Sequence, residues 1–215
     1  MIQVEIWSDF VCPFCYIGKR NFDQALSHFD GRGEVEVIYR SFELDPTAKK
    51  SQTITIEQYL SRKYGQPIEW ARKANEHVTK TAEQVGLKYV LDKIVPTNSF
   101  DAHRLSHVAA QAGLQDRAQE VLFSSYFCEG KDLALEAVLS EAASKIGLDP
   151  AEALAKLSDE RISQEVRSDE QEAQKLGISG VPFFVFDRKV GVSGAQPPEV
   201  FLEALKRAQA DSAKV

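Results

Sequence analysis

Two cysteines that follow a strand and open a helix limit the fold of this chain more than any other feature of its sequence. Residues 2–8 alternate apolar and polar side chains, a pattern that predicts a strand, and Pro13 directly follows Cys12. Proline is favoured at the first position of a helix, because its fixed φ suits the helix and its missing N–H would have no partner there. The sequence therefore predicts a strand that runs into a helix at Cys12, with Cys15 one turn further along the same helix face.

A second strand follows this helix. The helix is expected to continue to about Phe29, where the glycine-containing residues 30–33 end it. Residues 35–42 are rich in β-branched and aromatic side chains, which favours a strand. An order of strand, helix and strand favours two parallel strands joined by a right-handed crossover.

The C-terminal part returns to strands after a long helical stretch. Residues 181–186 and 190–192 have strand character on either side of a turn at 187–189, which predicts a hairpin, and a last helix is expected from Pro198 to about residue 208. From about residue 56 to 176 the pattern is helical throughout. Four of these helices are expected to end at a glycine followed by an apolar residue, at Gly86, Gly113, Gly147 and Gly177.

This order of elements predicts an α/β protein with a thioredoxin-like fold (βαβ … αββα) and an inserted all-helical domain. A thioredoxin-type unit would use only about half of the 215 residues, so the helical stretch fills the remainder. We expect the thioredoxin-like domain to comprise residues 1–55 and 167–215. The inserted helical domain is expected to comprise residues 56–166.

Composition narrows the range of partners. The net charge of -6, without a dominant cluster of Lys and Arg, argues against nucleic acid. Neither is a membrane partner expected, because the chain lacks a run of about 18 apolar residues. The expected location follows from the start of the sequence and from its cysteines. Met1 leads straight into a strand pattern without the basic and apolar regions of a signal peptide, and the chain has three cysteines. So few cysteines suit a reducing compartment, and we expect a cytoplasmic location.

The position of the two cysteines predicts redox chemistry. A helix N-terminus carries a partial positive charge and N–H donors without partners, and both stabilise a thiolate on Cys12 relative to its thiol. Because Cys15 lies on the same helix face, the two sulfur atoms can meet. We therefore expect Cys12 to be the nucleophile that forms a mixed disulfide with a substrate, and Cys15 to resolve it.

Two other roles for the cysteine pair are less favoured by the sequence. A CxxC pair can form half of a zinc site, but a second Cys or His pair at ligand spacing is missing, so no metal is expected. His103 and His107 are four residues apart but lack the intervening Glu of a zinc protease motif. A purely structural disulfide is disfavoured because closing so short a loop constrains the unfolded chain very little.

Four segments make the chain resemble the DsbA-like thioredoxin-fold family, and within it the FrnE branch. They are Ser8-Asp9-Phe10-Val11-Cys12-Pro13-Phe14-Cys15-Tyr16-Ile17-Gly18, Asn98-Ser99-Phe100-Asp101-Ala102-His103-Arg104, Gly180-Val181-Pro182-Phe183-Phe184 and Val192-Ser193-Gly194-Ala195-Gln196-Pro197. The resemblance covers nearly the whole chain. It implies a helical domain inserted into a thioredoxin fold, with the active site in the groove between them.

The resemblance also gives Pro182 a role. Proline is tolerable at the start of a strand, where its missing donor costs little, and a trans proline there is the plain alternative. In thioredoxin-like proteins this location holds a cis-proline beside the CxxC pair, so we expect the Val181–Pro182 bond to be cis. A cis bond would expose the Val181 backbone for pairing with a substrate strand. Pro13 and Phe14, between the cysteines, are expected to shape the surface that substrates contact.

The family contains enzymes of two kinds, and one residue distinguishes them. Disulfide oxidoreductases use both cysteines, whereas the glutathione-dependent 2-hydroxychromene-2-carboxylate isomerases and kappa-class glutathione transferases usually have a serine at the position of Cys12. A hydroxyl group cannot form a mixed disulfide. We therefore expect a thiol-disulfide oxidoreductase acting on protein or small-molecule thiols. The alternatives are a glutathione-dependent isomerase or transferase, and a chaperone-like protein that binds peptides beside Val181 and Pro182.

Asn98 and His103 match a family segment that lines the glutathione site of the isomerases. The resemblance therefore leaves glutathione open as a co-substrate, and no bound cofactor is expected. Both residues also have a purely structural interpretation, with Asn98 capping a helix and His103 packed on it. The direction of exchange, the physiological substrate and the oligomeric state are not set by the sequence.

Overall fold

The computed structural model describes residues 1–50 and 52–212. Contacts within the chain divide it into two compact units. One, the sheet unit, is formed by Met1–Leu44 together with the chain from Arg167 onward, and the other, the helical unit, is Asp45–Val166. The domain boundaries expected from the sequence lie between residues 55 and 56 and between residues 166 and 167, and they stay a prediction.

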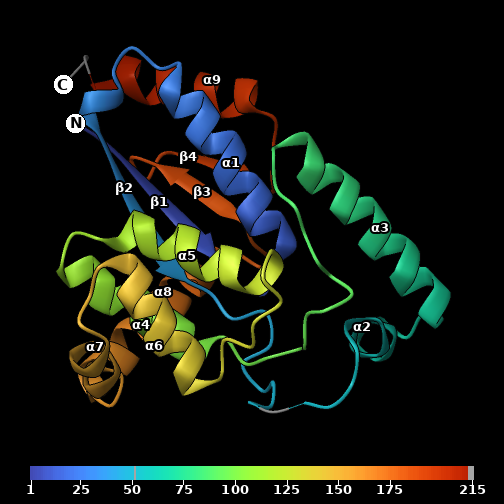
Figure 1. Ribbon diagram of the computed structural model, residues 1–215. Coiled ribbons are helices and arrows are strands. Elements are labelled where there is room, and N and C mark those ends of the chain that lie inside the picture. Colours follow the sequence, from blue (N-terminus) through green and yellow to red (C-terminus); the bar gives the residue numbers. More distant parts are fainter. Residues whose placement is uncertain (51, 213–215) are drawn as a thin grey trace. The chain divides into compact units, whose positions relative to one another are not determined.

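A four-stranded sheet forms the centre of the sheet unit (Figure 1). Its strands are β1 (Ile2–Ser8), β2 (Val35–Ser41), β3 (Phe183–Phe186) and β4 (Val190–Ser193), in the order β2-β1-β3-β4. β1 and β2 are parallel, with Ile2 opposite Val35 and Ser8 opposite Ser41, and β3 is antiparallel to both β1 and β4. The predicted parallel pair, the hairpin and the thioredoxin-like fold with its helical insertion are therefore confirmed.

The two faces of the sheet bury different side chains because residues alternate along β1. Ile2, Val4 and Ile6 pack on one face against α1 (Pro13–Ser27) and α9 (Pro198–Ser212), around a cluster of phenylalanines. The Phe22 and Phe184 rings lie 5.6 Å apart between centroids, in the tilted geometry that aromatic pairs favour. Trp7 points to the opposite face, where it packs against α8 (Glu160–Lys175).

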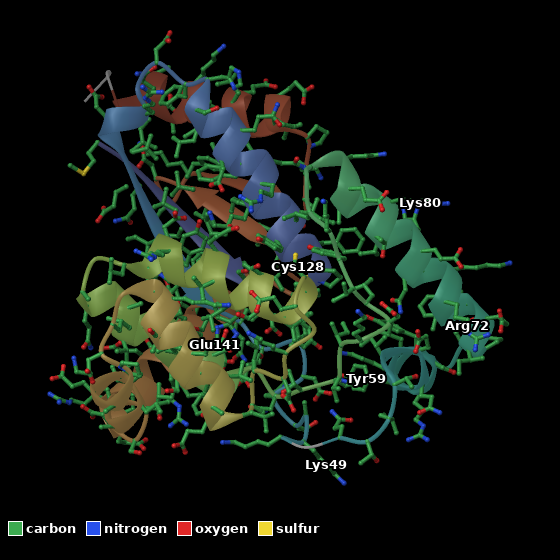
Figure 2. All side chains as sticks on the ribbon, viewed as in Figure 1. Lys49, Tyr59, Arg72, Lys80, Cys128 and Glu141 are labelled. Atoms are coloured by element: carbon green, nitrogen blue, oxygen red, sulfur yellow. The ribbon has the colours of Figure 1, made fainter. Side chains whose placement is uncertain are left out.

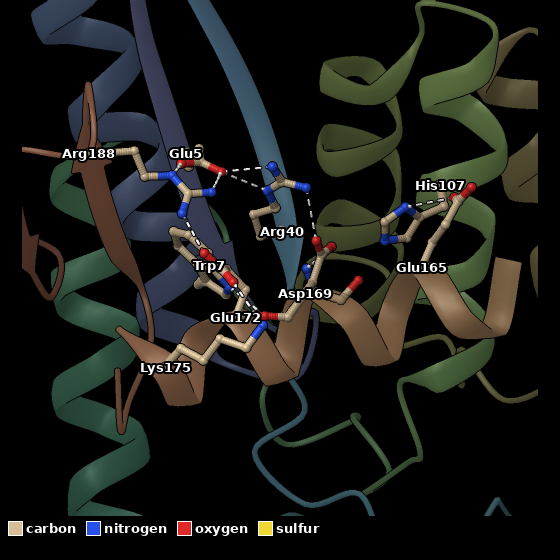
Figure 3. A network of polar contacts seen from close by, with 10 residues as sticks. Glu5, Trp7, Arg40, His107, Glu165, Asp169, Glu172, Lys175 and Arg188 are labelled. Atoms are coloured by element: carbon tan, nitrogen blue, oxygen red, sulfur yellow. Dashed lines mark hydrogen bonds and ion pairs between the residues drawn. The ribbon is translucent and has the colours of Figure 1, made fainter. Parts of the chain in front are cut away.

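That opposite face also holds a charged network (Figure 3). Glu5, from the middle of β1, is 1% exposed and lies between two arginines. Arg40 of β2 donates to Glu5 at 2.7 Å, and Arg188, from the turn between β3 and β4, donates to the same carboxylate at 2.8 Å. Arg40 also donates to Asp169 of α8 at 3.0 Å. A buried carboxylate needs such partners, because its isolated charge would be costly away from water.

The helical unit contains α2 (Ile56–Tyr64), α3 (Ile68–Gln84), α4 (Phe100–Gln111), α5 (Gln115–Phe127), α6 (Glu136–Ile146), α7 (Pro150–Lys156) and the beginning of α8. The four glycines predicted to end helices all have positive φ. At each of them the next residue donates its N–H to the carbonyl five residues before it, at 2.8–3.0 Å, as in Leu114 to Ala109. This is the Schellman arrangement, which gives the last carbonyls of a helix their partners.

Some element ends differ from the sequence prediction. α1 stops at Ser27, and a single 3-10 turn, Arg32–Glu34, leads into β2. β3 begins at Phe183, two residues later than expected, and α9 extends to Ser212 because no glycine or proline stops it near residue 208. Within the described residues, no helix has both the length and the apolar character needed to cross a lipid bilayer.

Candidate active site at the start of α1

The structure places both cysteines where the sequence predicted them. Cys12 is the N-cap of α1 with an extended backbone (φ -94°, ψ 111°), and Pro13 follows as the first helical residue. The Cys12 N–H donates to the Asp9 carbonyl, and the Cys15 N–H donates to the Cys12 carbonyl, both at 3.0 Å. Both thiols are free, and the residues are only 4% and 2% exposed. The site is therefore a buried dithiol at a helix N-terminus.

The segment before β3 lies against Cys12. The Cys12 thiol donates a hydrogen bond to the Val181 carbonyl oxygen, with 3.5 Å between sulfur and oxygen, although the two residues are 169 positions apart in the sequence. The Val181–Pro182 bond is cis, as predicted, and Pro182 is buried while Val181 is half-buried. A backbone group of this segment is thus within reach of the sulfur predicted to attack the substrate.

Cys15 has a different environment. Burial raises the pKa of the Cys15 thiol well above its ordinary value. A hydrogen bond with the Cys12 side chain and the electrostatic interaction with Cys12 raise this pKa further. Hydrogen bonds from the Ser8 side chain and the Asp9 backbone act in the opposite direction and lower the pKa. Cys15 is therefore mostly a thiol at neutral pH, with two groups placed to stabilise its thiolate when that forms.

Ser8 and Asp9 have roles at the site that were not predicted from the sequence. The Asp9 side chain is fully buried and bonds two backbone N–H groups, Val11 at 3.3 Å and Leu44 at 2.7 Å. It therefore ties the turn that carries Cys12 to the chain just after β2. The position of Ser8 and Asp9 immediately before the CxxC segment was the one sequence signal that could have indicated their roles. Only the fold shows that Leu44 is a partner of Asp9.

Gly18 allows α1 to approach the segment at Pro182. A Cβ atom added at Gly18 would lie 3.0 Å from Pro182 Cγ and 3.5 Å from both the Phe184 ring and the Ala195 backbone. A glycine at this helical position costs stability relative to alanine. The close packing of helix and proline explains why glycine is needed there.

We expect Gly18→Ala to destabilise the reduced protein by about 1–2 kcal/mol, because overpacking outweighs the gain in helix propensity. Exchange activity should fall several-fold as Pro182 is pushed away from its place beside Cys12. Urea unfolding and an insulin-reduction assay measure the two effects. Gly33→Ala is the matched control, since a Cβ there would have no neighbour within 4 Å. Equal stability of the two variants would contradict this packing argument.

The remaining predicted residues divide between the two units. Pro13 is half-buried, and Phe14 is 40% exposed, so its ring is available at the surface of the sheet unit. Asn98 and His103 belong to the helical unit. The Asn98 side chain accepts from the Phe100 N–H at 3.0 Å at the start of α4 and donates to the Ala48 carbonyl at 3.1 Å. His103 is buried on α4, and a ligand-binding role for either residue stays a prediction.

Among residues 1–50 and 52–212, no group of three or more His, Cys, Asp or Glu side chains is arranged to hold a metal ion. Cys128, the third cysteine of the chain, is half-buried at the C-cap of α5.

Comparisons with known proteins agree with this fold. A crystal structure described as a probable DsbA oxidoreductase from Streptomyces coelicolor is 41% identical, with a TM-score of 0.92, and the match covers 98% of this chain and 91% of that chain. The uncharacterized protein YwbO of Bacillus subtilis is 26% identical over 214 residues, covering 97% of this chain and 98% of YwbO. A 2-hydroxychromene-2-carboxylate isomerase has a TM-score of 0.73 at 16% identity, with 99% and 98% of the two chains covered, which shows a shared fold alone. Residues 3–206 match the model of the DSBA-like thioredoxin domain, and the chain therefore belongs to that family.

Proposed function

We propose that this protein is a thiol-disulfide oxidoreductase of the DsbA type, in the FrnE-like branch, which cycles Cys12 and Cys15 between dithiol and disulfide. The observation that carries the proposal is the pair of free thiols one turn apart at the start of α1, with Cys12 bonded to the Val181 carbonyl. The 41% identity to a probable DsbA oxidoreductase over almost the whole chain supports it.

Each step of the proposed cycle breaks one disulfide bond and forms another. In reduction, the Cys12 thiolate attacks a substrate disulfide, forms a mixed disulfide and releases one substrate thiolate. The Cys15 thiolate then attacks the Cys12 sulfur and releases the second substrate thiol. The product is a Cys12–Cys15 disulfide, and two electrons have passed to the substrate. Oxidation of a substrate dithiol follows the same steps in reverse.

Substrate contact is assigned to the groups around Cys12. The exposed Phe14 ring offers an apolar surface next to the attacking sulfur, with Pro13 beside it. The Val181 carbonyl and the Pro182 segment offer backbone for pairing with an extended substrate. We propose protein or small-molecule thiols and disulfides as substrates, with glutathione as a co-substrate. The small number of cysteines favours a reducing compartment, and we propose the cytoplasm.

The test of this proposal is the redox equilibrium of the cysteine pair. The wild-type protein is equilibrated in glutathione buffers of increasing oxidising strength, thiols are trapped by alkylation, and the oxidised fraction is read by mass spectrometry. We expect a two-electron transition and catalysed reduction of insulin. Absence of a Cys12–Cys15 disulfide in every buffer would overturn the proposal.

The alternatives give different results. Glutathione-dependent turnover of an aromatic isomerisation that survives replacement of Cys15 would indicate the isomerase class. Peptide binding that survives replacement of both cysteines, without any exchange activity, would indicate the chaperone-like class.

The raised pKa of Cys15 predicts a pH-dependent resolving step. In the mixed disulfide Cys12 is neither a thiol nor a thiolate, so burial, the largest cause, is what keeps the pKa of Cys15 raised there. Because the thiolate attacks, the rate of resolution should rise about tenfold per pH unit through the neutral range and continue rising past about 8.5, where an ordinary thiol is half ionised. Ser8→Ala should slow the step in this range, since it removes a hydrogen bond that lowers the pKa of Cys15. Release of a chromogenic thiol from a mixed disulfide on Cys12 measures the rate. A rate that stays constant across neutral pH would contradict this expectation.

The raised pKa of Cys15 also makes the stability of the folded protein depend on pH. A thiol whose pKa is higher in the folded state than in the unfolded chain stabilises the fold below the ordinary thiol pKa, and this contribution is lost as pH rises through the folded value. The reduced wild type should therefore lose stability relative to Cys15→Ala above about pH 8.5.

A further inference from the structure

The junction between α2 and α3 in the helical unit exposes an unusual surface. Every residue from 62 to 70 is exposed, and so are Arg72 and Lys73 at the start of α3. Gly65, with φ +63°, ends α2, and Pro67 caps α3, so the turn between the two helices takes only three residues. We call residues 62–73 the basic aromatic tip.

Three large apolar side chains of the basic aromatic tip are in contact with solvent. Tyr64 is 56% exposed, Ile68 37% and Trp70 40%, and the Tyr64 and Trp70 rings lie 5.5 Å apart between centroids. Surface patches of this kind, ringed by polar residues, mark interaction sites. Tyrosine and tryptophan are enriched where proteins meet the headgroup region of a bilayer, because one part of each ring is apolar and another part is polar.

The charge of the basic aromatic tip is opposite to that of the whole chain. Residues 62–73 contain four basic side chains and one acidic side chain, a net of +3, in a protein of net charge -6. The one acidic residue, Glu69, pairs with Arg72 at 2.5 Å. The other three cations, Arg62, Lys63 and Lys73, have no further acidic residue inside the basic aromatic tip, although Lys63 also interacts with the Asp45 carboxylate outside it.

The shape of the basic aromatic tip favours a flat, deformable partner. A helix that docks in a protein groove presents a continuous apolar stripe along one face. Here the apolar residues lie around a turn, and the exposed face of α3 beyond it alternates charges at Glu76, Lys80 and Glu83. In Figures 1 and 2 the junction lies at the end of α3 that is remote from α4–α7 of the same unit, with Arg72 at that end and Lys80 further along.

We infer that the basic aromatic tip docks on the anionic surface of a lipid bilayer, with Trp70 and Tyr64 in the headgroup region. Basic residues near such a surface gain attraction from anionic lipids, and buried aromatic area adds to it. The sequence prediction that no membrane is a partner rested on the lack of a spanning segment. That property does not describe a basic and aromatic patch on the surface.

Tryptophan fluorescence provides a direct test. The chain has two tryptophans, and Trp7 is fully buried, so a change on adding vesicles reports on Trp70. The full-length protein is mixed with vesicles of phosphatidylcholine alone or of phosphatidylcholine with phosphatidylserine. We expect a blue shift and co-sedimentation only with the anionic vesicles, and both should weaken as salt rises.

Variants separate the basic aromatic tip from the rest of the surface. The double substitution Arg62→Glu and Lys63→Glu should lower the partition coefficient at least about tenfold. Trp70→Ser should lower it several-fold by sedimentation. Two controls should bind as wild type: Lys80→Glu, about 15 Å along α3 from Trp70, and Leu135→Ser, which removes a 51% exposed apolar side chain elsewhere in the unit. Circular dichroism checks that each variant is folded.

Three outcomes would overturn the inference. The first is a failure of the wild-type protein to bind anionic vesicles. The second is binding that the substitutions in the basic aromatic tip leave unchanged. Binding to soluble polyglutamate without any partition to vesicles would assign the surface to an acidic protein instead. Insulin reduction in solution should be equal in all these variants, so the result is independent of the proposed redox function.

Discussion

Cys12→Ser is expected to reduce disulfide exchange to the uncatalysed rate. A serine hydroxyl at the start of α1 cannot form a mixed disulfide, so the first step of the cycle is lost even though the fold is preserved. Insulin reduction with dithiothreitol or glutathione measures the loss. Cys128→Ser, which changes a half-buried thiol at the C-cap of α5, is the matched control and should keep wild-type activity.

Cys15→Ser should have a different effect. Cys12 can still attack, but the mixed disulfide no longer has a resolving thiol and should accumulate. Mass spectrometry of the variant after incubation with oxidised glutathione should show one added glutathione on Cys12. If Cys12→Ser kept full exchange activity, or if Cys15→Ser formed no adduct while cycling normally, the roles assigned to the two sulfur atoms would be wrong.

The largest loss of stability is expected from Asp169→Ala. Asp169 is 4% exposed, and its carboxylate accepts from the Ser41 N–H at 2.9 Å and from Arg40 at 3.0 Å (Figure 3). Removing it takes an acceptor from a buried backbone N–H and a counter-charge from a partly buried guanidinium. The free energy of unfolding should fall by roughly 2–4 kcal/mol.

Two variants test the cause of this loss. Asp169→Asn keeps one oxygen acceptor and should lose about half as much. Glu172→Ala, on the same helix, removes an ion pair with Arg188 in which both side chains are substantially exposed, and should cost less than about 1 kcal/mol. Urea denaturation of the three variants measures the differences. Equal losses for Asp169→Ala and Glu172→Ala would show that burial of the Asp169 carboxylate contributes nothing.

Local patterns in the sequence were sufficient for the elements and for the cysteine pair. The alternation in β1, Pro13 at the helix start and the glycine that ends each of four helices are all short-range signals, and the structure has each of them in place. A helix end without a stop signal was placed wrongly, since α9 continues to Ser212 and not to about residue 208. The cis bond at Pro182 was predicted from family resemblance, since the residues alone left a trans bond equally open.

Long-range partners were beyond prediction from a single sequence. Asp9 bonds to Leu44 across 35 residues and Asp169 to Ser41 across 128, and nothing in either segment indicates its partner. The close approach at Gly18 depends in the same way on Pro182, which lies far away in the sequence. These contacts arise only when the sheet brings distant segments together, so composition and periodicity carry no trace of them.

The sheet unit is built from both ends of the chain, and this has a consequence during synthesis. The Cys12 sulfur leaves the ribosome 169 residues before its partner, the Val181 carbonyl, and β3 cannot pair with β1 until then. At about 5–20 residues per second, this interval lasts on the order of 10–30 s. For that time the nascent chain carries both site cysteines without the strand that completes the site. A translating ribosome therefore holds this thiol open to cellular oxidants for longer than it would in a chain whose sheet closes early.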